Sequence, residues 1–307
     1  MSQEQNKDMS QYFYRASAAD FMKIPDAPIA YWLSNNAINS FIDGAPLADF
    51  ADPRVGLDTG DNDLFIMFWH EVDYKKIGFD HNSVESFLAS GKRYAPHTKG
   101  GDFRKWFGNI EFVLKFDAAA YKSLSKQGNK LPSKQFYFMP GSSWTRISSA
   151  KFSMRYNPAG FVFNSACPTL FSSSHENLLL ATGVLLSPVS QHLLKALSPT
   201  LNFQAGDIRR VPILNPKNSV IETIEECISI TQEDWKLYER AWDYSEPKIT
   251  TLISPCKKIS SSFLECSNSY KNLFLRLHSL ESRINKELID CYKLHDELNP
   301  EVPLGKV

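Results

Sequence analysis

The sequence predicts an α+β protein, and three observations support this fold class. Short apolar segments of strand length, separated by glycine, proline and asparagine, occupy much of the first half of the chain. An apolar stretch of helical length follows at 178–197. From Tyr270 onward, apolar residues recur every seven positions, which is typical of a long amphipathic helix. We therefore expect a mixed or antiparallel sheet with flanking helices, followed by a C-terminal helical segment.

The N-terminal part of the chain predicts little regular structure. Residues 1–20 are polar, and we expect them to be weakly ordered. Because they contain no apolar central region, we do not expect a signal peptide. A short helix is predicted after Pro28, running through Trp32 to Phe41 and ending near Gly44.

Six short segments are predicted to be strands, because each is apolar and bounded by turn residues. The first, 64–72, is almost wholly apolar and is expected to be buried. The others are 110–116, 136–139, 143–147, 152–156 and 160–163. The segment 178–197 is predicted to be helical, and Pro188 either kinks this helix or divides it in two.

The last third of the chain is more charged. Short amphipathic segments are expected at 221–230 and 231–244, and a linker at 245–260. The seven-residue repeat contains two rows of positions: Tyr270, Leu277, Ile284, Cys291 and Leu298, and Leu273, Leu280, Glu287 and Leu294. Since Glu287 interrupts the second row, the repeat fits an intramolecular helix pair as well as a dimer.

Composition limits the function classes. The 34 basic and 34 acidic side chains give a formal net charge of +0, so a nucleic-acid binder would need local clusters of positive charge. The five cysteines are odd in number and form no C-x-x-C pair, which favours reduced thiols in a cytoplasmic protein over disulfides or structural zinc. No stretch reaches the roughly 18 apolar residues that a membrane span needs, so we expect no membrane partner.

Several catalytic motifs are absent from the sequence. Adenine methyltransferases hold the flipped base with an Asn/Asp/Ser-Pro-Pro-aromatic tetrad, and this chain contains no Pro-Pro pair. It also contains no glycine-rich turn for S-adenosylmethionine and no Walker P-loop. We therefore expect no catalytic residue, no metal site and no cofactor in this chain.

The glycine-rich segment 92–109 is the strongest candidate for a nucleic-acid contact. Its basic residues could bind phosphates, and its paired glycines allow close backbone approach. The alternative is a solvated loop whose aromatic residues anchor it to the core. The candidate contacts in this loop are Lys99, Gly100, Gly101, Arg104, Lys105, Trp106 and Asn109.

A second candidate is the segment 142–155, where hydroxyl-bearing and basic residues alternate with apolar ones. In a strand, Trp144 and Arg146 would share one face, and Lys151 and Arg155 the other. The alternative is the exposed face of a half-buried sheet. The turn at Thr59-Gly-Asp-Asn could present Asn62 to DNA, although a structural role for this turn is favoured.

Two segments resemble a known class of domain. Residues 56–65 are similar to the G-x-x-T-G-x-N-x-x-F element of target-recognition domains in type I and type IIG restriction–modification systems, and 185–213 resembles the end of such domains. Further segments resemble the PglX family, the adenine-specific DNA methyltransferases of bacteriophage-exclusion (BREX) defence systems. These segments are 24–32, 99–109, 144–152, 234–244 and 296–302.

The resemblance implies a domain organisation and partners. It implies a target-recognition domain at 21–215 after the N-terminus (1–20), then short helices and a linker at 216–260 and an amphipathic helix at 261–307. The expected partners are double-stranded DNA and a methyltransferase catalytic domain or other defence-complex subunits. S-adenosylmethionine would bind that catalytic domain, whose motifs this chain lacks. The alternatives are a protein-interaction fragment, docking to defence partners or a phage inhibitor, and a methyltransferase by descent only.

Overall fold

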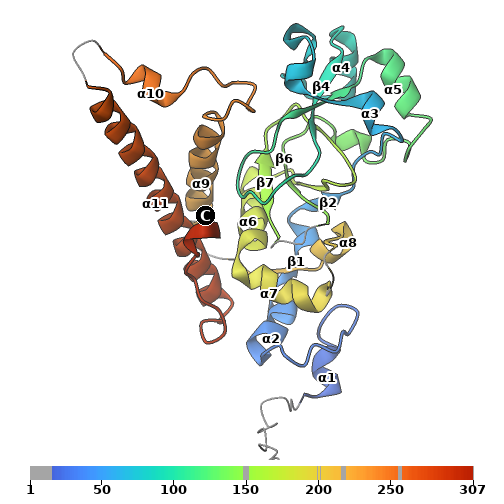
Figure 1. Ribbon diagram of the computed structural model, residues 1–307. Helices are drawn as coiled ribbons and strands as arrows, with labels where there is room; N and C mark the ends of the chain where they lie inside the picture. Colours follow the sequence, from blue (N-terminus) through green and yellow to red (C-terminus); the bar gives the residue numbers. More distant parts are fainter. Residues whose placement is uncertain are drawn as a thin grey trace, which may run out of the picture.

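The computed structural model is an α+β protein, as the sequence predicts, with three small sheets and a long C-terminal helix (Figure 1). The sheets and the helices that cover them form one part of the molecule, and the helices α9 and α11 form a V beside it. The described residues are 16–147, 152–198, 200, 202–215, 219–254 and 258–306. The remainder of the segment 1–20, expected to be weakly ordered, lies outside them.

The first sheet has four antiparallel strands in the order β2-β9-β6-β7. Its strands are β2 (Asp52–Arg54), β9 (Thr169–Phe171), β6 (Gly141–Trp144) and β7 (Met154–Asn157). One face carries Trp144, Met154 and Leu170, which are buried in the main core together with the apolar residues of helix α6 (His175–Leu186). The other face carries Arg155, which lies opposite Ser143 in the register.

The second sheet is mixed, with the order β3-β5-β4-β8. Strands β3 (Ile66–Phe68), β5 (Phe112–Lys115) and β4 (Tyr94–Thr98) are antiparallel, whereas β8 (Val162–Phe163) pairs with β4 in parallel. Aromatic side chains from both sheets form a second core that includes Phe163 and Phe171, whose ring centroids are 5.0 Å apart. A third, two-stranded sheet pairs β1 (Ala45–Pro46) with β10 (Pro212–Ile213).

Short helices and turns connect these strands, and most α-helices begin at a capping side chain. The short α-helices within the part of the molecule that holds the sheets are α1 (Ala18–Phe21), α2 (Asn35–Asp43), α3 (Asn62–Phe65), α4 (Val84–Ala89), α5 (Ala118–Leu124) and α8 (Ala205–Ile208). The 3-10 turns are η2 (Leu47–Asp49), η3 (Trp69–Glu71), η4 (Tyr74–Lys76), η5 (Lys134–Phe136) and η6 (Leu304–Lys306).

Of the two alternatives for the segment 178–197, a kinked helix or two helices, the structure shows two helices. Helix α6 ends at Leu186, and α7 (Pro188–Leu197) begins with Pro188 at its first position, where the missing N–H costs nothing. The two helices meet at 76°. Within the described residues no single helix meets the length and hydropathy of a membrane span, and only this bent pair does so jointly.

The C-terminal helices differ in extent from the prediction. Helix α9 (Ser219–Trp235) is continuous, so the predicted division at residue 230 is wrong. The one-turn helix α10 (Lys248–Thr251) interrupts the predicted linker. Helix α11 (Ile259–Cys291) begins close to the expected start at residue 261 but ends before Leu294 and Leu298 of the repeat. In its C-terminal half, α11 packs against α9 and α7 and buries Leu280, Ile284 and Leu288, as expected for an intramolecular helix pair.

The structure corrects two strand predictions and one loop prediction. The segment 64–72 contains only the three-residue strand β3, because Asp61 caps α3 and the Glu71 carboxylate accepts the Phe68 N–H at 2.8 Å. The segment 136–139 is not a strand, since it leaves the turn η5 with Phe138 at φ +69°. Conversely, the predicted loop at 90–109 contains β4, whose five residues are all buried.

Candidate nucleic-acid interface

Trp106 anchors the loop between β4 and β5 to the rest of the protein. Its backbone extends the first sheet, because its N–H donates to the Met154 carbonyl at 2.9 Å and its own carbonyl accepts from Tyr156 at 2.7 Å. Its buried indole Nε1 donates to Glu281 Oε1 on α11 at 2.5 Å. The loop is therefore held at once by β7 and by the long helix.

Lys105 binds the same carboxylate. Its Nζ forms an ion pair with Glu281 Oε2, and the side chains of Lys105 and Glu281 are 12% and 3% exposed. A buried carboxylate must be paired and hydrogen-bonded to be tolerated, and Lys105 and Trp106 together satisfy this requirement. We name this arrangement the Glu281 clasp.

Arg104 also contacts the helices. Its Nη2 lies 2.7 Å from Asp234 Oδ2, and its Nε donates to the Phe107 carbonyl at 2.7 Å. The guanidinium stacks over the rings of Trp235 and Tyr238, at 5.1 and 5.5 Å from their centroids. The structure thus engages Arg104, Lys105 and Trp106 in intramolecular contacts, and two positive charges of the loop are balanced within the chain.

The tip of the loop is held differently. Gly100 and Gly101 have φ values of +88° and +129°, which favour glycine, and the Gly101 carbonyl accepts a hydrogen bond from Thr145 Oγ1 at 3.3 Å. Asn109 closes the loop by donating from Nδ2 to the Asp102 carbonyl at 2.8 Å. Lys99 lies over the Phe112 ring, 4.9 Å from its centroid, and is partly exposed.

The parts of strands β6 and β7 that lie within the segment 142–155 are buried on both faces, where the sequence suggested an exposed polar face. Trp144 is fully buried and donates from Nε1 to the Phe203 carbonyl at 2.9 Å. Arg155 is 2% exposed, and its Nη2 lies 3.4 Å from Thr145 Oγ1 and 3.8 Å from Cys167 Sγ. Arg146 is partly exposed and donates to Asn202 Oδ1 at 3.2 Å. The remaining candidate, Lys151, lies outside the described residues.

Asn62 takes part in a capping turn. It is the first residue of α3, and its Oδ1 accepts a hydrogen bond from Thr59 Oγ1 at 2.8 Å. Asp61 caps the helix by accepting the Leu64 N–H at 3.1 Å. The turn is therefore built by its own side chains, although Asn62 remains exposed.

These separate segments meet in a row of loops. Ser165 donates to Asp58, the Arg146 N–H donates to the Ala166 carbonyl at 3.0 Å, and Thr145 reaches Gly101. We name this set of segments the loop row: 58–62, 99–102, 145–147, 164–166, and residues 200 and 202. The sequence did not indicate that 164–166 belongs here. Within the row Ile147 is 70% exposed and follows Arg146 directly.

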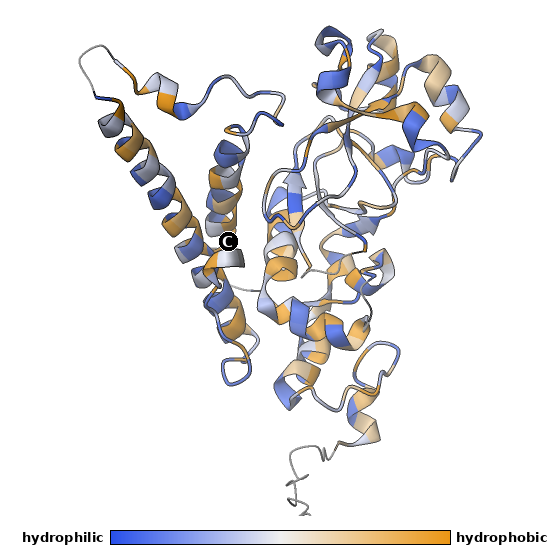
Figure 2. Cartoon of the chain, in the orientation of Figure 1, coloured by the Kyte–Doolittle hydropathy of each residue, from blue (hydrophilic) through white to orange (hydrophobic). Residues whose placement is uncertain are grey.

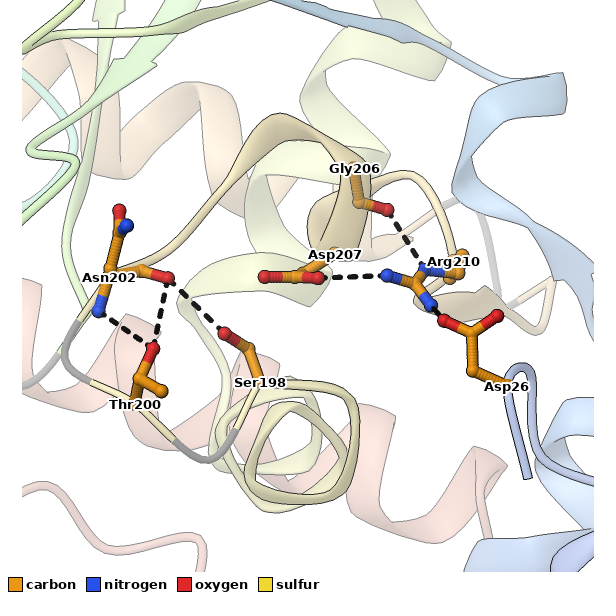
Figure 3. Close-up of polar contacts among 7 residues, drawn as sticks. All are labelled: Asp26, Ser198, Thr200, Asn202, Gly206, Asp207 and Arg210. Atoms are coloured by element: carbon orange, nitrogen blue, oxygen red, sulfur yellow. Dashed lines mark hydrogen bonds and ion pairs between the residues drawn. The ribbon is translucent and has the colours of Figure 1, made fainter. Parts of the chain in front are cut away.

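The C-terminal end of the row is fixed by hydroxyl groups (Figure 3). Ser198 Oγ donates to the Asn202 carbonyl at 3.2 Å, and the Asn202 N–H donates to Thr200 Oγ1 at 3.2 Å. The Asn202 amide points away from both hydroxyls, which leaves it free to meet Arg146. This turn therefore positions a side chain of the loop row.

A neighbouring cluster ties the end of the domain to its beginning. Arg210 donates to the Gly206 carbonyl at 3.0 Å and to Asp207 Oδ1 at 2.9 Å, and it forms an ion pair with Asp26 (Figure 3). Asp207 therefore has a structural role. In the part of the chain that the structure describes, no group of histidine, cysteine and acidic residues could hold a metal ion.

One buried group between the sheets has a strongly shifted pKa. Burial lowers the pKa of His97 to about 3, and neither ring nitrogen has a hydrogen-bond partner of normal geometry. The ring is therefore neutral at physiological pH and belongs to the core.

Comparison with known proteins relates the chain to DNA-modifying enzymes. No protein-family model matches it. It is 33% identical over 309 residues to the adenine-specific methyltransferase PglX of Lacticaseibacillus casei (strain Zhang), covering 97% of this chain and 26% of the relative. It is 34% identical over 292 residues to the adenine-specific methyltransferase BrxX of Escherichia coli O9:H4 (strain HS), covering 92% of this chain and 23% of the relative.

The chain is thus homologous over most of its length to a segment of these methyltransferases, and it spans about a quarter of their length. Among solved structures, the type IIL restriction–modification enzyme MmeI in complex with DNA is similar with a TM-score of 0.34 and 13% identity. That match covers 82% of this chain and 36% of MmeI.

Proposed function

We propose that this chain, homologous to a quarter of the PglX and BrxX methyltransferases, is a sequence-specific double-stranded DNA recognition module. It would serve an N6-adenine methyltransferase of a phage-defence system of the BREX type. Methyl transfer would take place in a catalytic domain outside this chain, which would also bind S-adenosylmethionine. The module's role would be to hold the duplex and present the target adenine.

One observation carries the proposal: the combination of homology and missing chemistry. The alignment to PglX includes 97% of this chain, yet the sequence contains no Pro-Pro pair from which the adenine-binding tetrad could be built. A methyltransferase segment without its catalytic motif needs another task. Target recognition is the task that the 56–65 and 185–213 resemblances favour.

The loop row is the surface that we propose to contact DNA. Lys99 and Arg146 would bind phosphates, and the backbone at Gly101 would allow close approach to the duplex. Ile147 would make an apolar base contact, such as one to a thymine methyl group. Asn62, in the 58–62 part of the loop row, remains a candidate, and so does Lys151, which lies outside the described residues.

The buried candidates would act by holding the loop row in place. Trp106 and Trp144 have their indole N–H groups bound within the protein, and Arg155 is buried beneath Thr145. Arg104 and Lys105 are paired with Asp234 and Glu281. Reversing their charge would break these contacts, so they are poor probes of DNA binding.

The test is a charge reversal of Lys99 and Arg146, which are partly exposed, with a matched control. Lys99→Glu and Arg146→Glu, alone and together, are compared with Lys286→Glu on the exposed side of α11. Duplexes enriched from a random library by the wild-type chain serve as the DNA. Each phosphate contact that is lost should reduce the slope of log K against log salt by about 0.9. Unchanged affinity and slope in the double variant would refute the loop row as the interface.

A second measurement tests the alternative that the chain is a methyltransferase by descent only. We expect isothermal titration calorimetry to detect no binding of S-adenosylmethionine to this chain, because the sequence contains no glycine-rich cofactor turn. Saturable binding would instead indicate that this chain itself has a cofactor site, as a methyltransferase would. The remaining alternative, a protein-interaction role, is favoured by one feature of helix α11 that the DNA interface does not use.

A further inference from the structure

Exposed apolar side chains concentrate between residues 238 and 275. Eight large hydrophobic residues there are between 37% and 68% exposed. They are Tyr238, Ile253, Ile259, Phe263, Leu264, Tyr270, Phe274 and Leu275. Single exposed apolar residues are normal on a protein surface, but a cluster of this kind marks an interaction site.

The two halves of α11 differ in their packing. The C-terminal half is covered by α9 and α7, whereas the N-terminal half diverges from α9 and keeps its apolar residues (Figures 1 and 2). There, α10 contacts the helix through hydrogen bonds from Ser262 to the Leu252 carbonyl at 2.9 Å and from Lys248 to Ser269 at 2.6 Å, and Lys248 Nζ lies 5.5 Å from the centroid of the Tyr270 ring. Phe263, Tyr270 and Phe274, at positions i, i+7 and i+11, share one side of the helix and keep 60%, 37% and 39% of their surface exposed.

This side of the helix opens into a cavity. The cavity has a volume of about 570 Å³ and lies between the loop at 103–106 and the helices α9 and α11. Tyr238, Tyr270 and Phe274 line it on the helical side, and Arg104 and Trp106 line it on the side of the loop. A side chain inserted here would touch the base of the same loop whose tip belongs to the loop row.

Lysines flank this surface together with acidic residues such as Glu246 and Glu265. Among the described residues, Lys248, Lys258 and Lys271 form no ion pair, and all three lie close in sequence to the exposed apolar residues. A complementary partner would therefore offer apolar side chains at the centre and carboxylates at the edge. This pattern fits a protein surface and not the phosphates of DNA alone.

We propose that the N-terminal half of α11 and the adjoining cavity form the docking face for the methyltransferase region of the same enzyme. This rests on the proposed function, since it assumes that this chain serves such a region. About three quarters of PglX and BrxX lie outside the matched segment, so a large partner is covalently joined to the homologous segment. Covalent linkage gives an effective concentration on the order of millimolar, at which a modest apolar face suffices for docking.

Docking at this face would stabilise the base of the loop at 99–109. Arg104 and Trp106 line the cavity, and the Glu281 clasp holds the loop to α11 just beyond it. The partner would thus contact the part of the protein that positions the loop row. DNA recognition and catalysis would be coupled through the loop at 99–109 without any shared residue.

The experiment compares hydrogen–deuterium exchange of α11 in two contexts. The first is this chain alone, and the second is L. casei PglX in which this chain replaces the aligned segment. We expect amides within 259–277 to exchange roughly tenfold or more slowly in the full-length protein. Phe263→Asp with Phe274→Asp should abolish this protection, whereas Asn272→Asp, an exposed position elsewhere on the same helix, should retain it.

Equal exchange of 259–277 in both contexts would overturn the proposal. If the chimera does not fold, native full-length L. casei PglX is measured instead, and rapid exchange in the N-terminal half of its aligned helix overturns it equally. Sedimentation of the isolated chain covers the other occupant: a dimer that Phe263→Asp dissociates would assign the face to a second copy. DNA binding by the Phe263→Asp, Phe274→Asp chain should be unchanged, and a wild-type chain that binds no DNA would refute only the proposed function.

Discussion

Replacement of Glu281 by alanine tests whether the Glu281 clasp positions the loop at 99–109. The substitution removes the carboxylate that accepts both the Lys105 ammonium and the Trp106 indole N–H. Because these donors are largely buried, nothing replaces the lost acceptor. Removing one partner of a buried ion pair costs about 3–5 kcal/mol. For a chain of 307 residues, whose unfolding entropy is about 0.6 kcal/mol/K, this corresponds to a Tm lower by about 5–8 °C.

Three further variants separate charge from hydrogen bonding. Glu281→Gln keeps an acceptor for Trp106 but loses the charge facing Lys105, and should cost about 1–3 kcal/mol. Lys105→Met combined with Glu281→Met removes both charges and should recover the part of the loss that comes from the unpaired Lys105 ammonium, while the Trp106 N–H without an acceptor should still cost about 1–3 kcal/mol. Asp290→Ala, at an exposed acidic position of the same helix, should change stability by no more than about 0.5 kcal/mol.

The assay combines urea denaturation with DNA binding. Glu281→Ala should weaken DNA binding because the loop loses its tether, while the salt slope should change by less than one phosphate contact, since Glu281 touches no DNA in the proposed arrangement. A loss of stability below about 1 kcal/mol would refute the clasp as the anchor of the loop. Reduced stability with unchanged DNA affinity would refute its role in positioning the loop row.

Three other predictions concern the core and the loop. Burial lowers the pKa of His97 from 6.5 to about 3, so only the unfolded ring takes up a proton as the pH falls below 6.5. Stability should therefore fall by about 2 kcal/mol between pH 7 and pH 5, and His97→Gln should remove this loss in urea titrations. Gly101→Ala and Gly108→Ala both place an alanine at a strained positive φ, +129° and +121°. Only the added Cβ at position 108 would also overlap Arg104, at 2.3 Å from its Nε. Gly108→Ala should consequently lower the free energy of unfolding by about 2 kcal/mol more. Among the described cysteines, the half-buried Cys291 should be alkylated first, yet slowly, because burial raises its pKa; peptide mass spectrometry measures this order.

Elements that depend on local rules could be predicted from the sequence. Pro188 divides α6 from α7 because a proline fits the first turn of a helix but not its interior. The seven-residue repeat predicted the long helix. Strands β5 and β8 lie within segments that apolar residues and turns had marked, and β7 overlaps such a segment. Strand β4 escaped prediction because Tyr94–Thr98 includes a proline and a histidine within a basic segment. Its strand character depends on pairing with β5 and β8, which the local pattern does not encode.

The ion pairs of the candidate site could not be predicted from the sequence either. Arg104 and Lys105 looked available for phosphates because no acidic residue opposes them nearby except Asp102. Their partners, Asp234 and Glu281, lie 130 and 176 positions away in the sequence. A local excess of charge therefore cannot distinguish a cation that binds DNA from one that fastens a loop. The pairing carboxylate can be identified only from the tertiary structure.

The residues that carry the family resemblance illustrate what such a resemblance marks. Trp106 and Trp144 belong to the most distinctive matching segments, and both are buried anchors whose indole N–H groups are bound within the protein. Large rings fixed in this way determine where a loop emerges, and leave its tip open to change. The exposed residues of the loop row, among them Gly101 and Ile147, contribute little to the core. A recognition module built in this way could change its target by substitution at the tips while the anchors preserve the fold, which is why the resemblance indicates the kind of domain and not its DNA sequence.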